Sequence, residues 1–474
     1  MKKTSDYSHG WHMAPAGARA RIPPPLIERI DDGSNPAWRY QWRILLEAPG
    51  LDTIDVGGAW FSSNHPIKPL TGTANAALVG SLAPLMALGL PVVVEGGVSP
   101  ALLRNLTLWQ SAFAAWYPPL RVVPIEAPPA PEPAADAGDD QRGDTILFSL
   151  GVDSWFSALR HHDNDATLVF IDGFDLTLDQ VAARADLRSA VQAAAAEINR
   201  PLVVLQSNLR DMLDRWLDWF ASHGTFLGAA SMLLEGSAAR VFQPSSARTF
   251  EPDPWGSNPL TDPLFTTERL RTIYDAGELQ RMEKLIWLLD QPVAMRNLRV
   301  CWSGTEGRRN CGRCSKCLRT MIAIHLFAGL QRAPLFPPSI DLEVLANTRW
   351  VYGFAQDTPR LLPAAAVLGA DDDPVYKVLD QRLRDLRVES LLNGGTPGSL
   401  KKVHADQWGP LLKRLRDQIA GDFMAHAPKQ VNRALAPAVP KVAGEALAAM
   451  WHKDRGWLQR EAAKTDAVGM HGRQ

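Results

Sequence analysis

The sequence predicts an α/β protein with a doubly wound parallel sheet, an N-terminal α+β domain and a helical C-terminal region. Three observations support this class. Short apolar strands alternate with helices between residues 144 and 333, a run rich in proline, alanine and aspartate precedes them, and helical apolar spacing dominates after residue 334. We therefore expect domains at 1–127 and 144–333, a linker at 128–143 and a helical region at 334–474.

The N-terminal region mixes strand-like and helical patterns. We expect strands at Trp42–Glu47, Pro91–Glu95 and Leu120–Ile125, and a helix at Ser99–Trp116. The most apolar stretch, Ala76–Val94, is interrupted by glycine and proline and predicts a buried helix followed by a strand, not a membrane span. Because the first residues contain no apolar signal segment, we expect a cytoplasmic protein without a membrane partner.

Beyond the linker, strands and helices alternate as they do in doubly wound sheets, where ligands bind beyond the carboxyl ends of the strands. The expected strands are Thr145–Phe148, Ala166–Ile171, Leu202–Leu205 and Arg240–Gln243. The expected helices are Trp155–His162, Thr177–Ile198, Leu209–Phe220, Thr225–Ala238, Val375–Leu392 and Pro410–Met424.

The overall charge gives no general signature of nucleic-acid binding. The 474 residues have a formal net charge of -1, a sequence pI of about 6.8 and 46% hydrophobic residues, as expected for a globular protein with a large core. Residues 401–474 are an exception, with 13 basic and 7 acidic residues and hence a net charge of +6. We interpret this excess as a solvated helical surface, with contact to a partner or nucleic acid as the alternative.

All four cysteines lie in one short stretch, as Cys301, Cys311, Cys314 and Cys317. Two overlapping C-x-x-C turns allow successive thiolates to converge on one ion, and four thiolates complete a tetrahedral shell, which predicts a structural Zn²⁺. An iron–sulfur cluster is an alternative, although the ferredoxin spacing would require a fourth cysteine where Met321 stands. Disulfides are a further alternative that would require export.

The run Ser149-Leu150-Gly151-Val152-Asp153-Ser154 lies between the first strand and the first helix of the α/β region. A turn there presents backbone N–H groups and the positive end of the helix dipole to an anion, and the serine hydroxyls can bind phosphate oxygens. Asp153 could hold Mg²⁺. We therefore predict that these six residues bind a nucleotide, with an ordinary structural turn as the alternative. Neither a Walker motif nor a dinucleotide fingerprint occurs in the chain.

At these residues the sequence resembles the PP-loop ATP pyrophosphatases, whose motif is S-G-G-x-D-S/T. The cysteine spacing is similar to the zinc site of the 7-cyano-7-deazaguanine synthase family within that superfamily. The resemblance covers roughly Asp144 to Ala328 and implies ATP cleavage between the α and β phosphates, with Asp153 and Ser154 as catalytic residues. In place of the second motif glycine stands Leu150, and a leucine is costly if that backbone position requires a positive φ.

Further candidates follow from the strand ends. We expect Asp172 to contribute to cofactor binding, and we name five weaker substrate candidates in the following loops: Asp175, Arg210, Trp255, Asn258 and Asp262. Taken singly, such residues are often turn formers or helix caps.

The predicted reaction is activation of a carboxylate or amide by ATP, followed by attack of ammonia or an amine. If all four cysteines bind metal, none remains for sulfur transfer or a glutaminase, so ammonia would come from solution or another protein. The alternatives are a zinc-stabilised nucleotide-binding scaffold and an RNA-modifying enzyme. The sequence does not specify the acceptor, and it is compatible with a homodimer.

Overall fold

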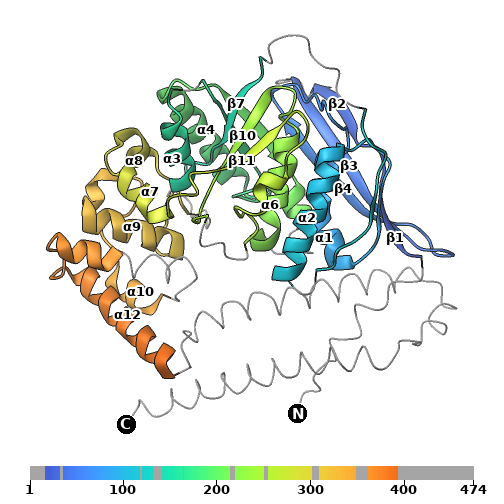
Figure 1. The fold of residues 1–474 in the computed structure, drawn as a ribbon. Coiled ribbons are helices and arrows are strands. Elements are labelled where there is room, and N and C mark those ends of the chain that lie inside the picture. The colour runs from blue at the N-terminus through green and yellow to red at the C-terminus, as the bar shows by residue number, and fades with distance from the viewer. Residues whose placement is uncertain are drawn as a thin grey trace.

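The computed structural model describes residues 17–31, 36–117, 120–131, 141–163, 165–213, 219–249, 255–301, 309–348 and 361–392. Within them, eleven strands form one mixed sheet (Figure 1). The strands are β1 (Arg19–Ile22), β2 (Leu26–Asp31), β3 (Pro36–Glu47), β4 (Ile54–Ser63), β5 (Val92–Val94), β6 (Ile125–Glu126), β7 (Gly143–Leu147), β8 (Thr167–Asp172), β9 (Leu202–Ser207), β10 (Ala238–Pro244) and β11 (Arg271–Asp275). Their order is β11-β10-β7-β8-β9-β4-β3-β1-β5-β6, with β2 also paired to β3.

The five strands from β11 to β9 are parallel and form the α/β half of the sheet. Counted along the chain they take the order 5-4-1-2-3, so the winding reverses between β7 and β10. This order is compatible with the predicted doubly wound fold. In such sheets the crevice at the reversal, at the carboxyl ends of the two central strands, is the usual ligand site.

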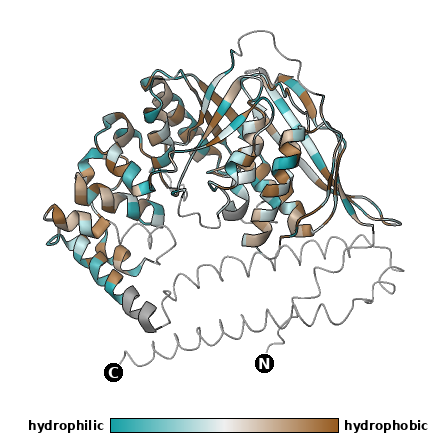
Figure 2. Ribbon diagram, viewed as in Figure 1, coloured by the Kyte–Doolittle hydropathy of each residue, from teal (hydrophilic) through white to brown (hydrophobic). Residues whose placement is uncertain are grey.

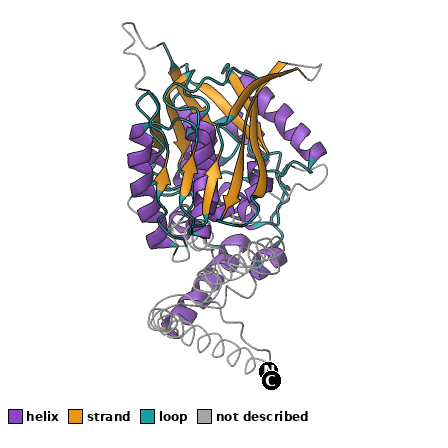
Figure 3. Ribbon diagram, turned by 90° about the vertical axis from the view of Figure 1, so that its right-hand side faces the viewer, coloured by secondary structure: helices purple, strands orange, loops and turns teal. Residues whose placement is uncertain are grey.

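Helices cover both faces of the sheet (Figure 3). The described helices are α1 (Asn75–Leu88), α2 (Pro100–Trp116), α3 (Val152–Arg160), α4 (Val181–Glu197), α5 (Leu209–Leu213), α6 (Trp219–Met232), α7 (Arg281–Leu288), α8 (Pro292–Asn297), α9 (Ser315–Phe327), α10 (Leu342–Asn347) and α12 (Pro374–Leu392), with short 3-10 turns η1 (Asp262–Leu264) and η2 (Leu330–Arg332).

Alternate residues of the parallel strands point into two separate cores. Ile146 and Phe148 of the β7 segment pack with α3, α4 and α7 to α9, whereas Leu147 packs with α1, α2 and α6. This follows from the two-residue period of a strand, which places neighbouring side chains on opposite faces.

The N-terminal strands extend the same sheet. Antiparallel pairing of β4 with β9 joins Phe61 to Ser207 and Ser63 to Leu205. The junction is reinforced by Asn208, whose side chain accepts from the Trp60 N–H at 2.8 Å and donates to the Gly58 carbonyl at 2.9 Å. The sheet therefore continues from the predicted N-terminal domain into the α/β domain, although residues 132–140 between them lie outside the described part.

Several predicted elements agree with the structure. The apolar stretch is the almost completely buried helix α1 followed by β5, and none of the described helices is long and apolar enough to cross a membrane. From Gly58 to Ser63, buried residues of β4 alternate with more accessible ones. Hydrophilic and hydrophobic residues are mixed along the strands of the sheet (Figure 2). The strand predicted at Leu120–Ile125 is wrong except at its end, where β6 spans Ile125–Glu126. The helix predicted at Pro410–Met424 lies outside the described residues.

Candidate nucleotide and metal site

The segment Ser149–Ser154 connects β7 to α3 at the carboxyl edge of the sheet, beside the point where the winding reverses. Gly151 is the N-cap of α3 and provides no side chain to satisfy the first N–H groups of the helix. These groups have no partner within a helix. The loop therefore combines a helix N-terminus with the reversal point, two features that favour an anion.

Leu150 has the left-handed backbone conformation for which glycine is suited, with φ of 63°. For a residue with a Cβ, this conformation costs about 1–2 kcal/mol. Two interactions offset the cost. The side chain is completely buried in the core beneath α3, and the carbonyl accepts the backbone N–H of Arg299 at 3.0 Å. Since a hydrogen bond contributes about 0.5–1.5 kcal/mol net, it is comparable with the penalty.

The hydroxyl of Ser154 closes the loop internally. It accepts the N–H of Ser149 at 3.2 Å and donates to the carbonyl of Gly151 at 3.1 Å, with the Ser149 hydroxyl 3.5 Å away. Ser154 therefore shapes the turn in this structure, and a phosphate that bound it would have to replace or share these contacts. Val152, the first residue of α3, is buried in the core below.

Asp153 forms an ion pair with Arg281 at the start of α7, and both side chains are nearly buried, at 13% and 11% exposure. The second carboxylate oxygen, Oδ1, is buried and has no hydrogen-bond partner within the described residues. Buried carboxylate oxygens almost always have a partner, so this atom marks a place where a cation or a donor would be stabilising.

Further basic side chains approach the same loop. Lys284, one turn after Arg281 on α7, is completely buried and donates to the carbonyl and hydroxyl of Ser245, at 2.5 and 2.6 Å, just beyond β10. Burial lowers the pKa of Lys284, while the negative charge of Asp153 opposes that shift. Arg299 is almost fully buried, with its guanidinium 3.5 Å from Asp175.

Lys316 of α9 belongs to the same electrostatic environment. Burial lowers its pKa to about 8, against the attraction of Asp175 and Asp153 and together with repulsion from Arg281 and Arg319. No sequence pattern identified Arg281, Lys284, Arg299 or Lys316 as site residues. All four lie far from the loop in sequence, and only Lys316, inside a C-x-x-C turn, and Arg299, two residues before Cys301, have positions that could have suggested a role.

The predicted cofactor residue Asp172 is fully engaged by arginines of α4. Arg184 binds both of its oxygens, at 2.8 and 2.9 Å, and Arg188 adds a further contact. Arg210 donates to the backbone carbonyls of Phe174 and, at 2.9 Å, Asp175, so it supports the loop after β8. The structure therefore brings Asp175 toward the Ser149–Ser154 loop through Arg299, whereas Asp172 and Arg210 make structural contacts.

The remaining substrate candidates lie in the loop between β10 and β11. Trp255 contacts His223 of α6, with ring centroids 5.8 Å apart. Asp262 is completely buried and accepts from the Ser257 hydroxyl at 2.5 Å and the Asn258 N–H at 3.1 Å. Burial raises the pKa of Asp262 to about 7. Burial and the negative charges of Asp262 and Asp153 also raise the pKa of Tyr274, which links this cluster electrostatically to the loop.

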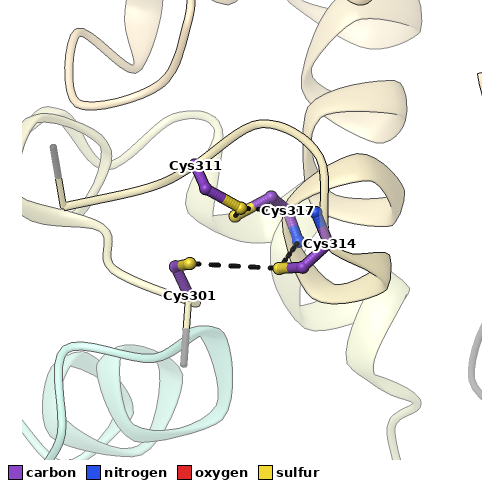
Figure 4. A group of neighbouring side chains, drawn as sticks. All are labelled: Cys301, Cys311, Cys314 and Cys317. Atoms are coloured by element: carbon purple, nitrogen blue, oxygen red, sulfur yellow. Dashed lines mark hydrogen bonds between the residues drawn. The ribbon is translucent and has the colours of Figure 1, made fainter. Parts of the chain in front are cut away.

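The four cysteine sulfurs converge at the start of α9, all within 4.8 Å of one another (Figure 4). The sulfurs of Cys311 and Cys317 are 3.8 Å apart, and those of Cys301 and Cys314 are 4.0 Å apart. Tetrahedral geometry with zinc–sulfur bonds of about 2.3 Å would separate the sulfurs by about 3.8 Å. The cluster therefore has the dimensions of a metal site and is compatible with zinc.

Backbone amides of the C-x-x-C turns point to the cysteine sulfurs. The N–H groups of Arg313 and Cys314 point to the sulfur of Cys311, at 3.4 and 3.3 Å, and that of Cys317 points to Cys314 at 3.4 Å. Gly312 has φ of 70°, and a Cβ there would lie 2.5 Å from the ring of Pro337. Only glycine therefore fits this turn without displacing its neighbour.

Comparison with known proteins identifies no family. No family model matches the chain, and neither the curated proteins nor the solved structures gave a match.

Proposed function

We propose that this chain is an ATP-dependent adenylating enzyme of the PP-loop type, forming AMP and pyrophosphate. The observation that supports this proposal most directly is the position of the Ser149–Ser154 loop at the winding reversal of the sheet. There the N-terminus of α3 faces the buried or nearly buried basic side chains of α7. An elongated polyanion such as a triphosphate suits this combination, because helix amides, Arg281 and Lys284 all favour negative charge.

The proposed reaction has two steps. A carboxylate or amide oxygen of the acceptor attacks the α-phosphorus of ATP, the bond to the bridging α–β oxygen breaks, and pyrophosphate leaves with that electron pair. With a carboxylate acceptor, ammonia or an amine then attacks the activated carbon, gives up a proton, and AMP leaves, which yields an amide. With an amide acceptor, the adenylated amide loses its N–H proton and AMP, which yields a nitrile without any further nitrogen donor. Amides and cations around the loop would stabilise the charge that develops on departing pyrophosphate.

Two metals have separate roles in this proposal. Asp153, with its unpartnered Oδ1, would hold Mg²⁺ once Arg281 moves aside, and Mg²⁺ would supply charge neutralisation of the phosphates. Zn²⁺ would be held by Cys301, Cys311, Cys314 and Cys317 as a closed structural site with no open position for substrate.

The test uses ATP labelled at the α-phosphate, Mg²⁺ and a metabolite pool, with AMP, ADP and pyrophosphate separated afterwards. We expect acceptor-dependent AMP and pyrophosphate without ADP, and loss of AMP formation in Asp153→Asn. The matched control is Asp144→Asn, at the opposite end of β7, where the carboxylate pairs with the half-exposed Arg240. Failure of the wild-type protein to bind Mg²⁺-ATP would refute the proposal.

A nucleotide-binding scaffold without catalysis is the second candidate. It is favoured by the strained Leu150 and by the Asp153–Arg281 pair, which withholds Asp153 from a metal in this structure. Such a protein would bind ATP with an occupancy that equilibrium dialysis can measure, yet would form no AMP with any acceptor tested.

A further inference from the structure

A short segment connects the cysteine cluster to the nucleotide loop. Arg299, whose backbone N–H holds the carbonyl of Leu150, lies two residues before the metal ligand Cys301. Two residues of extended chain span at most about 7 Å. A displacement of Cys301 would therefore move Arg299 and disturb this hydrogen bond. The short stretch of backbone from Arg299 to Cys301 therefore provides one metal ligand and also binds the left-handed residue of the loop.

Asn310 fastens the same segment from the other side of the cluster. This completely buried side chain, adjacent to the ligand Cys311, accepts the Val300 N–H at 2.9 Å. Its amide group donates to the Leu298 carbonyl at 2.9 Å and to the Leu335 carbonyl at 3.3 Å. The backbone on both sides of Arg299 is therefore bound by a residue whose own place depends on the position of Cys311.

We infer that the cysteine-bound metal fixes the conformation of the nucleotide loop through residues 298–301, with Asn310 as the positioning residue. The left-handed conformation of Leu150 is unfavourable by an amount comparable with the Arg299 hydrogen bond that supports it. Loss of the metal frees Cys301 and Cys311, loosens Arg299 and lets the loop leave this conformation. Metal and nucleotide then favour each other's binding, and this second statement rests on the proposed function.

Hydrogen exchange tests the structural half of this inference without any nucleotide. Peptides covering residues 148–154 are followed in zinc-loaded and chelator-treated protein, with β3 as an internal control for global unfolding. We expect exchange in 148–154 to become at least tenfold faster without metal while β3 is unchanged. Equal protection of 148–154 in both forms would overturn the inference, because burial of the Leu150 side chain would then suffice.

If removal of the metal unfolds the whole chain, the inference is tested instead with a variant that retains all four metal ligands. Asn310→Ala should keep one zinc per chain, measured by elemental analysis, yet show faster exchange at 148–154. The matched control is Asn297→Ala on α8, whose side-chain amide donates to the Glu197 carboxylate at 2.8 Å and to the Val293 carbonyl at 3.0 Å. An Asn310→Ala protein that keeps its zinc and a fully protected loop would contradict the positioning role.

The nucleotide half is tested on the wild-type protein by linkage. Because coupling is reciprocal, α,β-methylene-ATP with Mg²⁺ should raise zinc affinity by the factor by which zinc raises nucleotide affinity, about fivefold or more. A fluorescent chelator calibrated in the same nucleotide buffer measures this. Nucleotide binding with unchanged zinc affinity would overturn the coupling but leave the proposed function intact. Absence of any nucleotide binding would refute the proposed function, while hydrogen exchange would still report on the metal and the loop.

Discussion

Asp153 and Arg281 form a nearly buried ion pair at the N-terminus of α3, although 128 residues separate them in the chain. Each belongs to a helix that begins at the carboxyl edge of the sheet, so the pair joins α3 to α7 directly above the proposed nucleotide loop. A phosphate would compete with Asp153 for Arg281, and a divalent cation would compete with Arg281 for Asp153.

We predict strong coupling between these two residues. Asp153→Asn and Arg281→Gln should each lower the free energy of unfolding by about 3 kcal/mol, because each leaves a buried charge without its partner. In urea unfolding, the free energy of unfolding of the double variant should be lowered by no more than that of the less stable single variant. The control is Arg43→Gln at the exposed pair with Asp55, which should cost about 1 kcal/mol or less. Additive losses at Asp153 and Arg281 would show that the pair is not stabilising.

We predict an inverted order of stability at position 150. At an ordinary buried position alanine is preferred to glycine, but a positive φ favours glycine by about 1 kcal/mol. Leu150→Ala and Leu150→Gly should both be destabilised by loss of core packing, by about 2–5 kcal/mol for alanine. The glycine variant should nevertheless be at least as stable as the alanine variant in equilibrium unfolding. A clearly more stable alanine variant would mean that the left-handed conformation is not retained.

We predict that Asp262 makes stability fall as the pH rises from about 4 to about 7. Its folded pKa is raised from 3.8 to about 7, so in that window the folded protein keeps a proton that the unfolded chain releases. Relative to Asp262→Asn, wild-type stability should decrease by about 1.4 kcal/mol per pH unit and then level off. Urea unfolding of both proteins at a series of pH values measures this difference, and parallel pH curves would contradict it.

We predict that Glu235→Gln is strongly destabilising. The buried carboxylate accepts four hydrogen bonds, from the N–H groups of Leu70 and Thr71 and from the hydroxyls of Thr71 and Thr267. A glutamine would turn an NH₂ donor toward some of these donors, leaving buried groups unsatisfied at about 2–4 kcal/mol. Thermal unfolding compared with Glu278→Gln, a half-exposed carboxylate, measures the effect. Similar small losses of stability in both variants would show that the hydrogen bonds around Glu235 rearrange to accommodate glutamine.

Local patterns predicted the features that depend on neighbouring residues. The strand–loop–helix unit around Ser149–Ser154 and the convergence of the four cysteines follow from short spacings, because a turn brings such residues together whatever surrounds them. The resemblance raised a left-handed conformation at position 150 only as a condition, and the structure has that conformation. Binding of ATP, Mg²⁺ and an acceptor stays a prediction from these features.

Only the tertiary structure decided what faces the loop. The sequence alone determined the strand–turn–helix segment at Ser149–Ser154 and the thiol cluster. The pairing of β4 with β9, the placement of Arg281 on Asp153 and the engagement of Asp172 by Arg184 came from the fold. The physical reason is distance along the chain. Periodicity and turn chemistry act over a few residues, but these contacts join segments whose approach depends on the order of strands in the sheet and on how the helices pack against it.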